Sequence, residues 1–323
     1  MNSAALVHVP GEPPRHGDAV EPEPGPGELL IAVTAAPITP LDRLCASGTS
    51  YFGRPAVPYV PGVQGVGVVE RGVGRILPGT PVWFATSAGM APGDGSMRTR
   101  ATAAEQDVVP LPDGADPVLV AALGLSAVAA EMALTWRGGL AAGEHVLVLG
   151  AGGIVGQAAV QLARAAGAGR VVAAARSQAA RDRALRLGAD AVAALPDGPA
   201  EVAELATELR EACGEPVDLV LDPVFGVAAA AALRVLRPGG RLVNLGSAAA
   251  ETAPIDSATL RSRSLQISGY TNNELSAEQR HAAITRVAEL AAAGRLTVEY
   301  AQAPLTSVAD VWTAAARTVL VPA

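Results

Sequence analysis

The hydrophobic pattern of residues 145–177 predicts a strand, a turn, a helix and a second strand in succession. Residues 145–149 form an apolar run too short for a helix, and a glycine-rich turn follows at 150–156. Apolar residues then recur at three- and four-residue spacing, as on one face of a helix: Val155, Ala158, Ala159, Leu162 and Ala166. A second apolar run covers 171–175. This order is the beginning of a doubly wound nucleotide-binding sheet.

The same alternation continues beyond residue 177. The pattern predicts helices at 179–187, 199–212, 227–236 and 277–293, and strands at 189–193, 218–222, 241–245 and 265–270. Strands that alternate with helices imply a parallel sheet with helices on both faces. We therefore expect an α/β fold for this part of the chain.

The first 122 residues have a different pattern. Short apolar runs at 6–9, 29–33, 65–69, 82–85 and 107–110 are separated by loops rich in proline and glycine. Such runs predict a small β-barrel. Residues 113–136 then predict a turn and a helix that lead into the second domain.

Composition excludes several classes of function. The 323 residues are 50% hydrophobic and only 17% charged, so disorder is excluded. The net charge of -7 argues against nucleic acid as a partner. Cys45 and Cys213 lack a metal-type spacing and fit a reducing cytoplasm. The N-terminus does not look like a signal peptide, and the longest apolar stretch, 118–130, is shorter than a membrane span, so we expect no membrane partner.

The glycine turn has the spacing of a dinucleotide site. It reads Ala151-x-Gly153-x-x-Gly156. A Cβ at Gly153 would hold a pyrophosphate away from the backbone N–H groups, and Gly156 lets the helix lie close to the strand. An alternative is that the glycine turn serves only for packing. This interpretation is the weaker one, because a strand precedes the turn and a helix follows it. The predicted cofactor contacts here are Ala151, Gly152, Gly153, Ile154 and Val155.

The end of the second strand indicates which nucleotide binds. Folds selective for NAD place an acid there, but this chain has Ala175, followed by Arg176, Ser177 and, a turn later, Arg181. Guanidinium and hydroxyl groups suit a 2′-phosphate, so we predict NADP(H). The alternative is that Arg176 and Arg181 only begin a solvated helix.

The alanine at the first position of the turn is common in one known branch of dehydrogenases. The chain resembles, over nearly its whole length, the medium-chain dehydrogenase/reductase superfamily in its zinc-free quinone oxidoreductase (zeta-crystallin-like) branch. The resemblance implies a GroES-like β-barrel catalytic domain at 1–122, to which 271–323 return, and a Rossmann cofactor domain at 123–270. It also implies a homodimer.

The zinc positions of this superfamily hold other residues here. The cysteine position reads Thr39, the Gly-His-Glu run reads Gly62-Val63-Gln64, and residues 121–125 contain neither cysteine nor histidine. Zinc needs three or four nitrogen, sulfur or oxygen ligands. The four histidines are widely separated in the sequence, so we predict no metal.

The candidate catalytic residues follow from the same resemblance. Quinone oxidoreductases carry a segment like Asn-Pro-x-Asp…Arg-x-Gly-x-Tyr, and here Asp42 and Gly48 match it. Thr39 replaces the asparagine, Ala46 the arginine, and the tyrosine is shifted to Tyr51. The Tyr51 hydroxyl could donate a hydrogen bond to an acceptor carbonyl or relay a proton, or the ring could only pack at the rim.

Further cofactor contacts are expected at the ends of later strands and near the nicotinamide. The positions are Ser126, Leu245, Gly246, Ser247, Tyr270, Thr271 and Asn272. Ser126 could instead be a helix cap or turn hydroxyl. Asp222 ends another strand, and we interpret it as a turn-forming or capping residue.

Together these features predict a zinc-independent, NADPH-dependent oxidoreductase that transfers a hydride to a small-molecule acceptor, either a quinone or an activated alkene. A metal-free carbonyl reductase and a non-catalytic NADPH-binding protein are the alternatives. A methyltransferase is disfavoured, because the acid that would hold a ribose is missing at Ala175.

Overall fold

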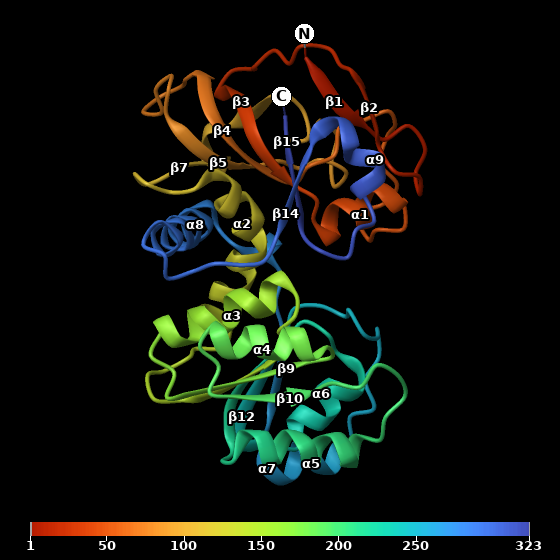
Figure 1. Ribbon diagram of the computed structural model, residues 1–323, viewed down its shortest axis with the longest axis vertical. Coiled ribbons are helices and arrows are strands. Elements are labelled where there is room, and N and C mark those ends of the chain that lie inside the picture. Colours follow the sequence, from red (N-terminus) through yellow and green to blue (C-terminus); the bar gives the residue numbers. More distant parts are fainter. Residues whose placement is uncertain (1, 323) are drawn as a thin grey trace. The chain divides into compact units, whose positions relative to one another are not determined.

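A computed structural model describes residues 2–322 (Figure 1). Its contacts divide the chain into two compact units. Unit 1 comprises Met1–Gly124 and Ala277–Ala323, and unit 2 comprises Leu125–Ser276. The boundaries predicted from the sequence were 122/123 and 270/271. Each unit has its own sheet and core, and the two are described separately.

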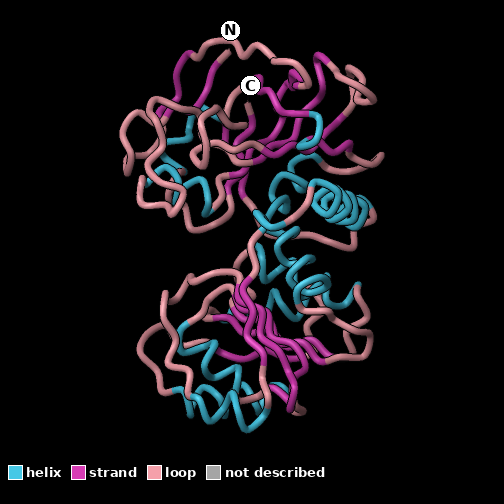
Figure 2. The backbone as a smooth tube through the Cα atoms, turned by 180° about the vertical axis from the view of Figure 1, so that it is seen from behind, coloured by secondary structure: helices cyan, strands magenta, loops and turns pink. Residues whose placement is uncertain are grey.

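Unit 2 is built on a six-stranded parallel sheet in the order β10-β9-β8-β11-β12-β13. The strands are β8 (His145–Leu149), β9 (Arg170–Ala175), β10 (Ala191–Ala194), β11 (Val217–Asp222), β12 (Leu236–Asn244) and β13 (Gln266–Gly269). Figure 2 shows these strands stacked side by side. The prediction of a doubly wound parallel sheet is confirmed.

Helices cover both faces of this sheet. On one side lie α3 (Ile154–Ala165) and α4 (Gln178–Arg186), and on the other α5 (Val202–Cys213) and α6 (Gly226–Leu233), with α7 (Ser257–Arg263) (Figure 1). Apolar side chains of α5 and α6, such as Leu209 and Leu233, pack with Leu147 and Val220 of the sheet into one core. Burying each such side chain contributes roughly 1.5–3 kcal/mol.

Unit 1 contains a seven-stranded sheet with the order β14-β15-β3-β4-β5-β7, and β6 also pairs with β3. The strands are β3 (Glu28–Pro37), β4 (Gln64–Arg71), β5 (Pro81–Ala85), β6 (Arg100–Ala104), β7 (Val108–Pro110), β14 (Ala301–Pro304) and β15 (Thr318–Val321). Strand β15 pairs antiparallel with β3, so the C-terminal segment returns to the first domain as the resemblance implied. Strands β1 (Ser3–Leu6) and β2 (Arg15–Asp18) form a separate pair, and helices α8 (Ala277–Ala292) and α9 (Val308–Val311) complete the unit.

Helix α2 (Pro117–Met132) carries the chain from unit 1 to unit 2 and breaks at Gly124 (φ 33°, ψ −133°). A Cβ at Gly124 would lie 2.1 Å from Oε1 of Gln64, so only glycine fits. A π-helical turn, Ala133–Arg137, extends the helix to 21 residues. By length and composition alone this helix could span a membrane, because it continues past the apolar run 118–130 through Glu131 to Arg137. However, 61% of its apolar window is buried in the protein, as in many core helices.

Some elements differ from the prediction in extent or existence. The first strand lies at Ser3–Leu6 and not at 6–9, because it pairs with β2, which the sequence did not reveal. Helix α6 ends at Leu233, and β12 begins at Leu236, where a helix was predicted. Helix α1 (Pro40–Ser47) was not predicted at all.

Candidate functional site

The glycine turn at the start of α3 is tightly packed at one glycine and open at another. A Cβ at Gly156 would lie 2.4 Å from the Gly150 carbonyl oxygen and 2.6 Å from the Ala151 Cα, so only glycine permits this close packing. A Cβ at Gly153 would meet nothing closer than the Gly150 oxygen at 3.7 Å. Gly153 is the N-cap of α3 and provides no side-chain cap. Its first-turn N–H groups can therefore bind an anion, as they do at many helix N-termini.

The parallel sheet brings the predicted cofactor residues to one edge. Strands β9, β8, β12 and β13 run in the same direction, so their carboxyl ends lie together. Residues that follow these ends are the predicted contacts Ala151 to Val155, Arg176, Ser177, Leu245, Gly246, Ser247 and Tyr270 to Asn272. Nucleotides bind at this edge in open α/β sheets.

At the end of β9, the three predicted phosphate ligands have different roles. The Arg176 side chain is exposed and has no hydrogen-bond or ion-pair partner within residues 2–322. The Ser177 hydroxyl caps α4 and accepts a hydrogen bond from the Ala180 N–H at 3.2 Å. The Arg181 guanidinium donates to the carbonyl oxygens of Ala175, at 2.9 Å, and of Arg176. Of the three, Arg176 alone has a side chain without a local partner.

The ends of β11 and β12 are tied together by Asp222, which is completely buried. One carboxylate oxygen accepts the N–H groups of Val224 (3.0 Å) and Phe225 (2.8 Å), and the other accepts the Asn244 amide at 3.0 Å. The turn-forming interpretation of Asp222 is confirmed. Burial raises the pKa of this carboxyl, and the hydrogen bonds oppose that rise. The next predicted contact, Leu245, donates its N–H to the Asp222 carbonyl.

The residues after β13 hold one another and the second half of α2. The Tyr270 hydroxyl donates to Oδ1 of Asn272 at 2.7 Å, and Nδ2 of Asn272 donates to the Leu125 carbonyl at 3.0 Å. Leu125 precedes the predicted contact Ser126. Burial raises the pKa of Tyr270, so its proton stays on the hydroxyl at physiological pH. Thr271 caps the following turn.

In unit 1, two of the predicted catalytic residues form a capping box at the start of α1. Thr39 Oγ1 accepts the Asp42 N–H, and the Asp42 carboxylate accepts the Thr39 N–H (2.8 Å) and hydroxyl (2.6 Å). The second Asp42 oxygen accepts the N–H groups of Gly62 (3.1 Å) and Val63 (2.9 Å). Asp42 is 1% exposed. Its hydrogen bonds connect α1 to the segment that precedes β4. These four hydrogen bonds give Asp42 a structural role, and its predicted catalytic role stays a prediction.

The Arg317 guanidinium acts on the charge of Asp42, a relation that the sequence does not indicate. Burial raises the pKa of Asp42, while the Arg317 guanidinium lowers it. Burial in turn lowers the pKa of Arg317 to about 10, and Asp42 opposes that fall. Arg317 lies just before β15, 275 residues after Asp42 (317 − 42), so no local pattern could have paired them.

The remaining unit 1 positions singled out in the sequence are Tyr51, Val63 and Gln64. Tyr51 is 76% exposed, and its ring contacts that of Phe52 with centroids 4.2 Å apart. Val63 and Gln64 are buried, and Gln64 accepts a hydrogen bond from the Trp83 indole at 3.1 Å. No group of three or more His, Cys, Asp or Glu side chains in the described chain could hold a metal ion.

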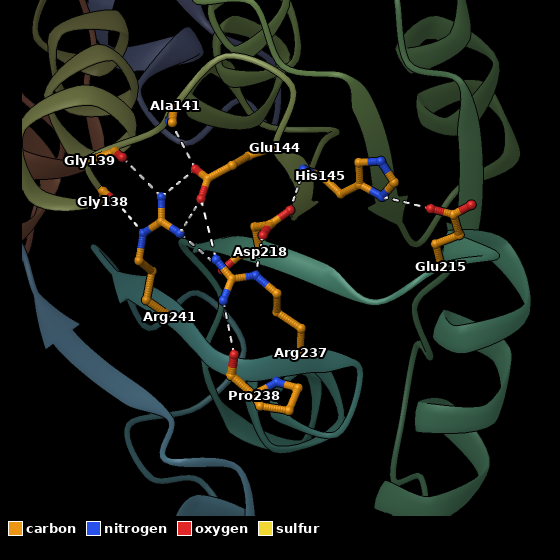
Figure 3. A network of polar contacts seen from close by, with 10 residues as sticks. All are labelled: Gly138, Gly139, Ala141, Glu144, His145, Glu215, Asp218, Arg237, Pro238 and Arg241. Carbon is orange, nitrogen blue, oxygen red and sulfur yellow. Dashed lines mark hydrogen bonds and ion pairs between the residues drawn. The ribbon is translucent and has the colours of Figure 1, made fainter.

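At the opposite edge of the unit 2 sheet, ion pairs connect the starts of three strands (Figure 3). Arg241 makes a two-pronged contact with Glu144 (3.0 and 2.6 Å) and also binds the carbonyls of Gly138 and Gly139. Asp218 pairs with Arg237 and accepts the His145 N–H at 2.7 Å. We call this set the strand-start network.

Comparisons with known proteins agree with this architecture. A family model described as an alcohol dehydrogenase GroES-like domain matches residues 25–113, and one described as a zinc-binding dehydrogenase matches residues 155–289. A quinone oxidoreductase of Rattus norvegicus is 32% identical over 234 residues, which are 71% of this chain and 67% of that protein. A mycobacterial protein solved in complex with NADPH superposes with a TM-score of 0.85 at 25% identity, over 100% of both chains.

A third relative is much larger than this chain. A mycocerosic acid synthase-like polyketide synthase of Mycobacterium tuberculosis is 34% identical over 227 residues, which are 69% of this chain but only 10% of that protein. The matches and the fold together define a two-domain oxidoreductase with a nucleotide-binding domain. The chain belongs to the medium-chain dehydrogenase/reductase superfamily, in its quinone oxidoreductase branch.

Proposed function

We propose that this protein is an NADPH-dependent, zinc-independent reductase of quinones or activated alkenes. The observation that carries the proposal is the end of β9, where a buried alanine, Ala175, replaces the acid of NAD-selective sites and the exposed Arg176 has a side chain without a local partner. A carboxylate at this position would repel a 2′-phosphate, whereas an unpaired guanidinium would attract one.

The nucleotide-binding groups that the chain offers suit a phosphorylated dinucleotide. The first-turn N–H groups of α3 would hold the pyrophosphate, and Arg176 would pair with the 2′-phosphate. When bound, NADPH would supply a hydride to the acceptor, and a proton taken up from solvent or from a donor side chain would complete the reduction. Ser126 and Tyr270 to Asn272 would border the nicotinamide portion, and Leu245 to Ser247 would contact the cofactor at the end of β12.

Acceptor chemistry without zinc must rely on side chains and backbone. The position expected to bind zinc through cysteine is Thr39, which is committed to its capping box with Asp42. Tyr51 is the exposed hydroxyl of the α1 region that would hydrogen-bond an acceptor carbonyl. The relationship to a quinone oxidoreductase favours quinones as acceptors. A homodimer and a cytoplasmic location stay predictions.

One experiment tests the proposal directly. NADPH oxidation would be followed against a panel of quinones, enones, enoyl thioesters, and simple aldehydes and ketones, with and without a chelator, and zinc would be measured by elemental analysis. We expect turnover with at least one acceptor, no loss with the chelator, and far less than one zinc per chain. Tight NADPH binding without turnover would favour the non-catalytic binding protein, and turnover with simple aldehydes or ketones only would favour the carbonyl reductase.

The cofactor preference has its own test. Arg176→Ala should weaken NADPH binding about tenfold to a hundredfold and leave NADH binding unchanged, because a charged hydrogen bond is worth roughly 1.5–3 kcal/mol. Calorimetric titration of both nucleotides measures this. Equal affinity of the unmodified protein for NADPH and NADH would overturn the NADP(H) assignment.

A further inference from the structure

We infer that Arg181 determines cofactor preference without touching the cofactor, by fixing the backbone that presents Arg176. The inference rests on the proposed function, since it assumes that Arg176 binds a 2′-phosphate. It makes Arg181 a positioning residue, whereas its sequence position suggested a second phosphate ligand.

The contacts of Arg181 carry the inference. Its Nη1 donates to the carbonyl oxygens of Ala175 (2.9 Å) and Arg176, and its Nη2 donates to the Gln178 side-chain oxygen at 2.8 Å. The planar guanidinium fork thus holds the last residue of β9, the next residue, and the first residue of α4 in one arrangement. These contacts use three of the five guanidinium N–H groups and fix the plane of the guanidinium against the backbone.

A second observation concerns the neighbouring acid. Asp182 follows Arg181 directly, but the Gln178 amide lies between the two charges: its oxygen accepts from Arg181, and its nitrogen donates to Asp182 Oδ1 at 2.7 Å. Gln178 therefore occupies both groups and keeps Asp182 from competing for the guanidinium. The Arg181 guanidinium therefore stays hydrogen-bonded to the backbone carbonyl oxygens of Ala175 and Arg176.

The placement of the charge is unfavourable for the helix itself. Arg181 lies near the N-terminus of α4, where a cation interacts poorly with the helix dipole, and the first turn holds no acid to offset it. An arginine that only stabilised α4 would sit better in the last turn, as Arg183 and Arg186 do. The contacts of Arg181 with Ala175 and Arg176 explain an arginine at this position, whereas the stability of α4 does not explain it.

The test is a double-mutant cycle read by calorimetric titration of NADPH and NADH. Arg181→Ala should weaken NADPH about fivefold to tenfold, equivalent to roughly one hydrogen bond, and change NADH less than about twofold. If Arg181 acts through Arg176, adding Arg181→Ala to Arg176→Ala should cause no further loss. Additive losses would mean that Arg181 contacts the phosphate itself and would overturn the inference.

Two further variants separate geometry from charge. Arg181→Lys keeps the charge but lacks the fork, so it should resemble Arg181→Ala; full rescue by lysine would overturn the inference in favour of a general charge effect. Gln178→Ala frees Asp182 to draw Arg181 away and should also weaken NADPH. The matched control is Arg186→Ala, which removes an exposed charge from the same helix and should leave NADPH affinity within about twofold.

The outcomes also separate this inference from the proposed function. If Arg176→Ala leaves NADPH affinity unchanged, the proposed cofactor preference fails, and the inference fails with it. If Arg176→Ala weakens NADPH but Arg181→Ala does not, the preference stands and the inference alone is wrong. Thermal unfolding of each variant guards against a change in fold, and an unfolded Arg181→Ala would leave the lysine and Gln178 variants to decide.

Discussion

The glycine turn of unit 2 (residues 150–156) and the α1 region of unit 1 are both tightly organised, but by different means. The turn is built from backbone: a Cβ at Gly156 would clash with Gly150 and Ala151, whereas the space beside Gly153 is open. The α1 region is built from side chains, because one buried carboxylate, Asp42, accepts four hydrogen bonds from two segments. The first arrangement leaves N–H groups open for a ligand, and the second uses them internally.

This difference indicates that ligand binding is expected at the turn of unit 2 and a rigid backbone around α1 of unit 1. In the turn, donors at the N-terminus of α3 have no side-chain cap and can serve a phosphate. Around Asp42, four donors of Thr39, Gly62 and Val63 are directed at the carboxylate, which holds α1 against the segment that precedes β4. Substitutions at the two places should therefore affect different measurements: binding in unit 2 and stability in unit 1.

The largest effect is expected for Asp42→Ala. It would leave the buried N–H groups of Thr39, Gly62 and Val63 without their acceptor and Arg317 without its counter-charge. We expect the free energy of unfolding to fall by about 3–5 kcal/mol. Urea denaturation measures this, and Asp42→Asn, which keeps the shape and part of the hydrogen bonding, should lose less. A loss below about 1 kcal/mol would contradict the structural role.

The next effect concerns the turn. Gly156→Ala places a Cβ against the backbone of Gly150 and Ala151, so stability should fall by about 1–3 kcal/mol and NADPH binding should fall with it. Gly153→Ala is the matched control, since its Cβ has space in the protein. It should keep stability within about 1 kcal/mol and weaken only the nucleotide. Equal losses of stability in both variants would contradict the different reasons given for the two glycines.

A third prediction uses pH. Burial raises the pKa of Glu144, but the hydrogen bonds from Arg241 and from the Ala141 N–H, together with the charge of Arg241, bring it below the ordinary value. A lowered folded-state pKa contributes stability above the unfolded value, near pH 4.3, and this is lost as pH falls through the folded value. Arg241→Met should therefore cost about 1–3 kcal/mol at pH 7 and clearly less at pH 3. A cost that does not change with pH would show that only the carbonyl contacts of Arg241 matter.

The smallest effect is expected at Tyr51. The ring is largely exposed, so Tyr51→Phe should not change stability or NADPH affinity. If the hydroxyl binds the acceptor, turnover should fall about tenfold or less, which corresponds to one neutral hydrogen bond of roughly 0.5–1.5 kcal/mol. Unchanged turnover with every acceptor would mean that the Tyr51 hydroxyl does not bind the acceptor and that the ring only packs against Phe52.

The parts of the structure that depend on local pattern could be predicted. Strand β8, the turn and α3 follow from apolar spacing and glycine, and each was found close to its predicted place. Helix α1 was missed although Thr39, Pro40 and Asp42 have the types expected for an N-cap, a first helical turn and a capping box. Those residues were interpreted only as a family motif for acceptor binding.

The roles of individual polar residues could not be predicted in the same way. Arg176 and Arg181 are equivalent in the sequence, and only the fold shows that one is exposed and the other binds carbonyls. Asp42 and Arg317 are distant in the chain and meet through the return of β15 to β3. Such pairings depend on topology, which hydrophobic spacing does not encode.

The strand-start network has a consequence for how fast an anionic ligand arrives. Glu144 and Asp218 each pair with a guanidinium. The electric field of each ion pair is that of a dipole, so it weakens with distance faster than the field of a single charge. At the other edge of the sheet, the exposed guanidinium of Arg176 has no such partner among residues 2–322 and would attract an approaching anion. Guidance of this kind acts over about 10 Å at 0.1 M salt. The association rate of the nucleotide, more than its dissociation rate, should therefore depend on ionic strength.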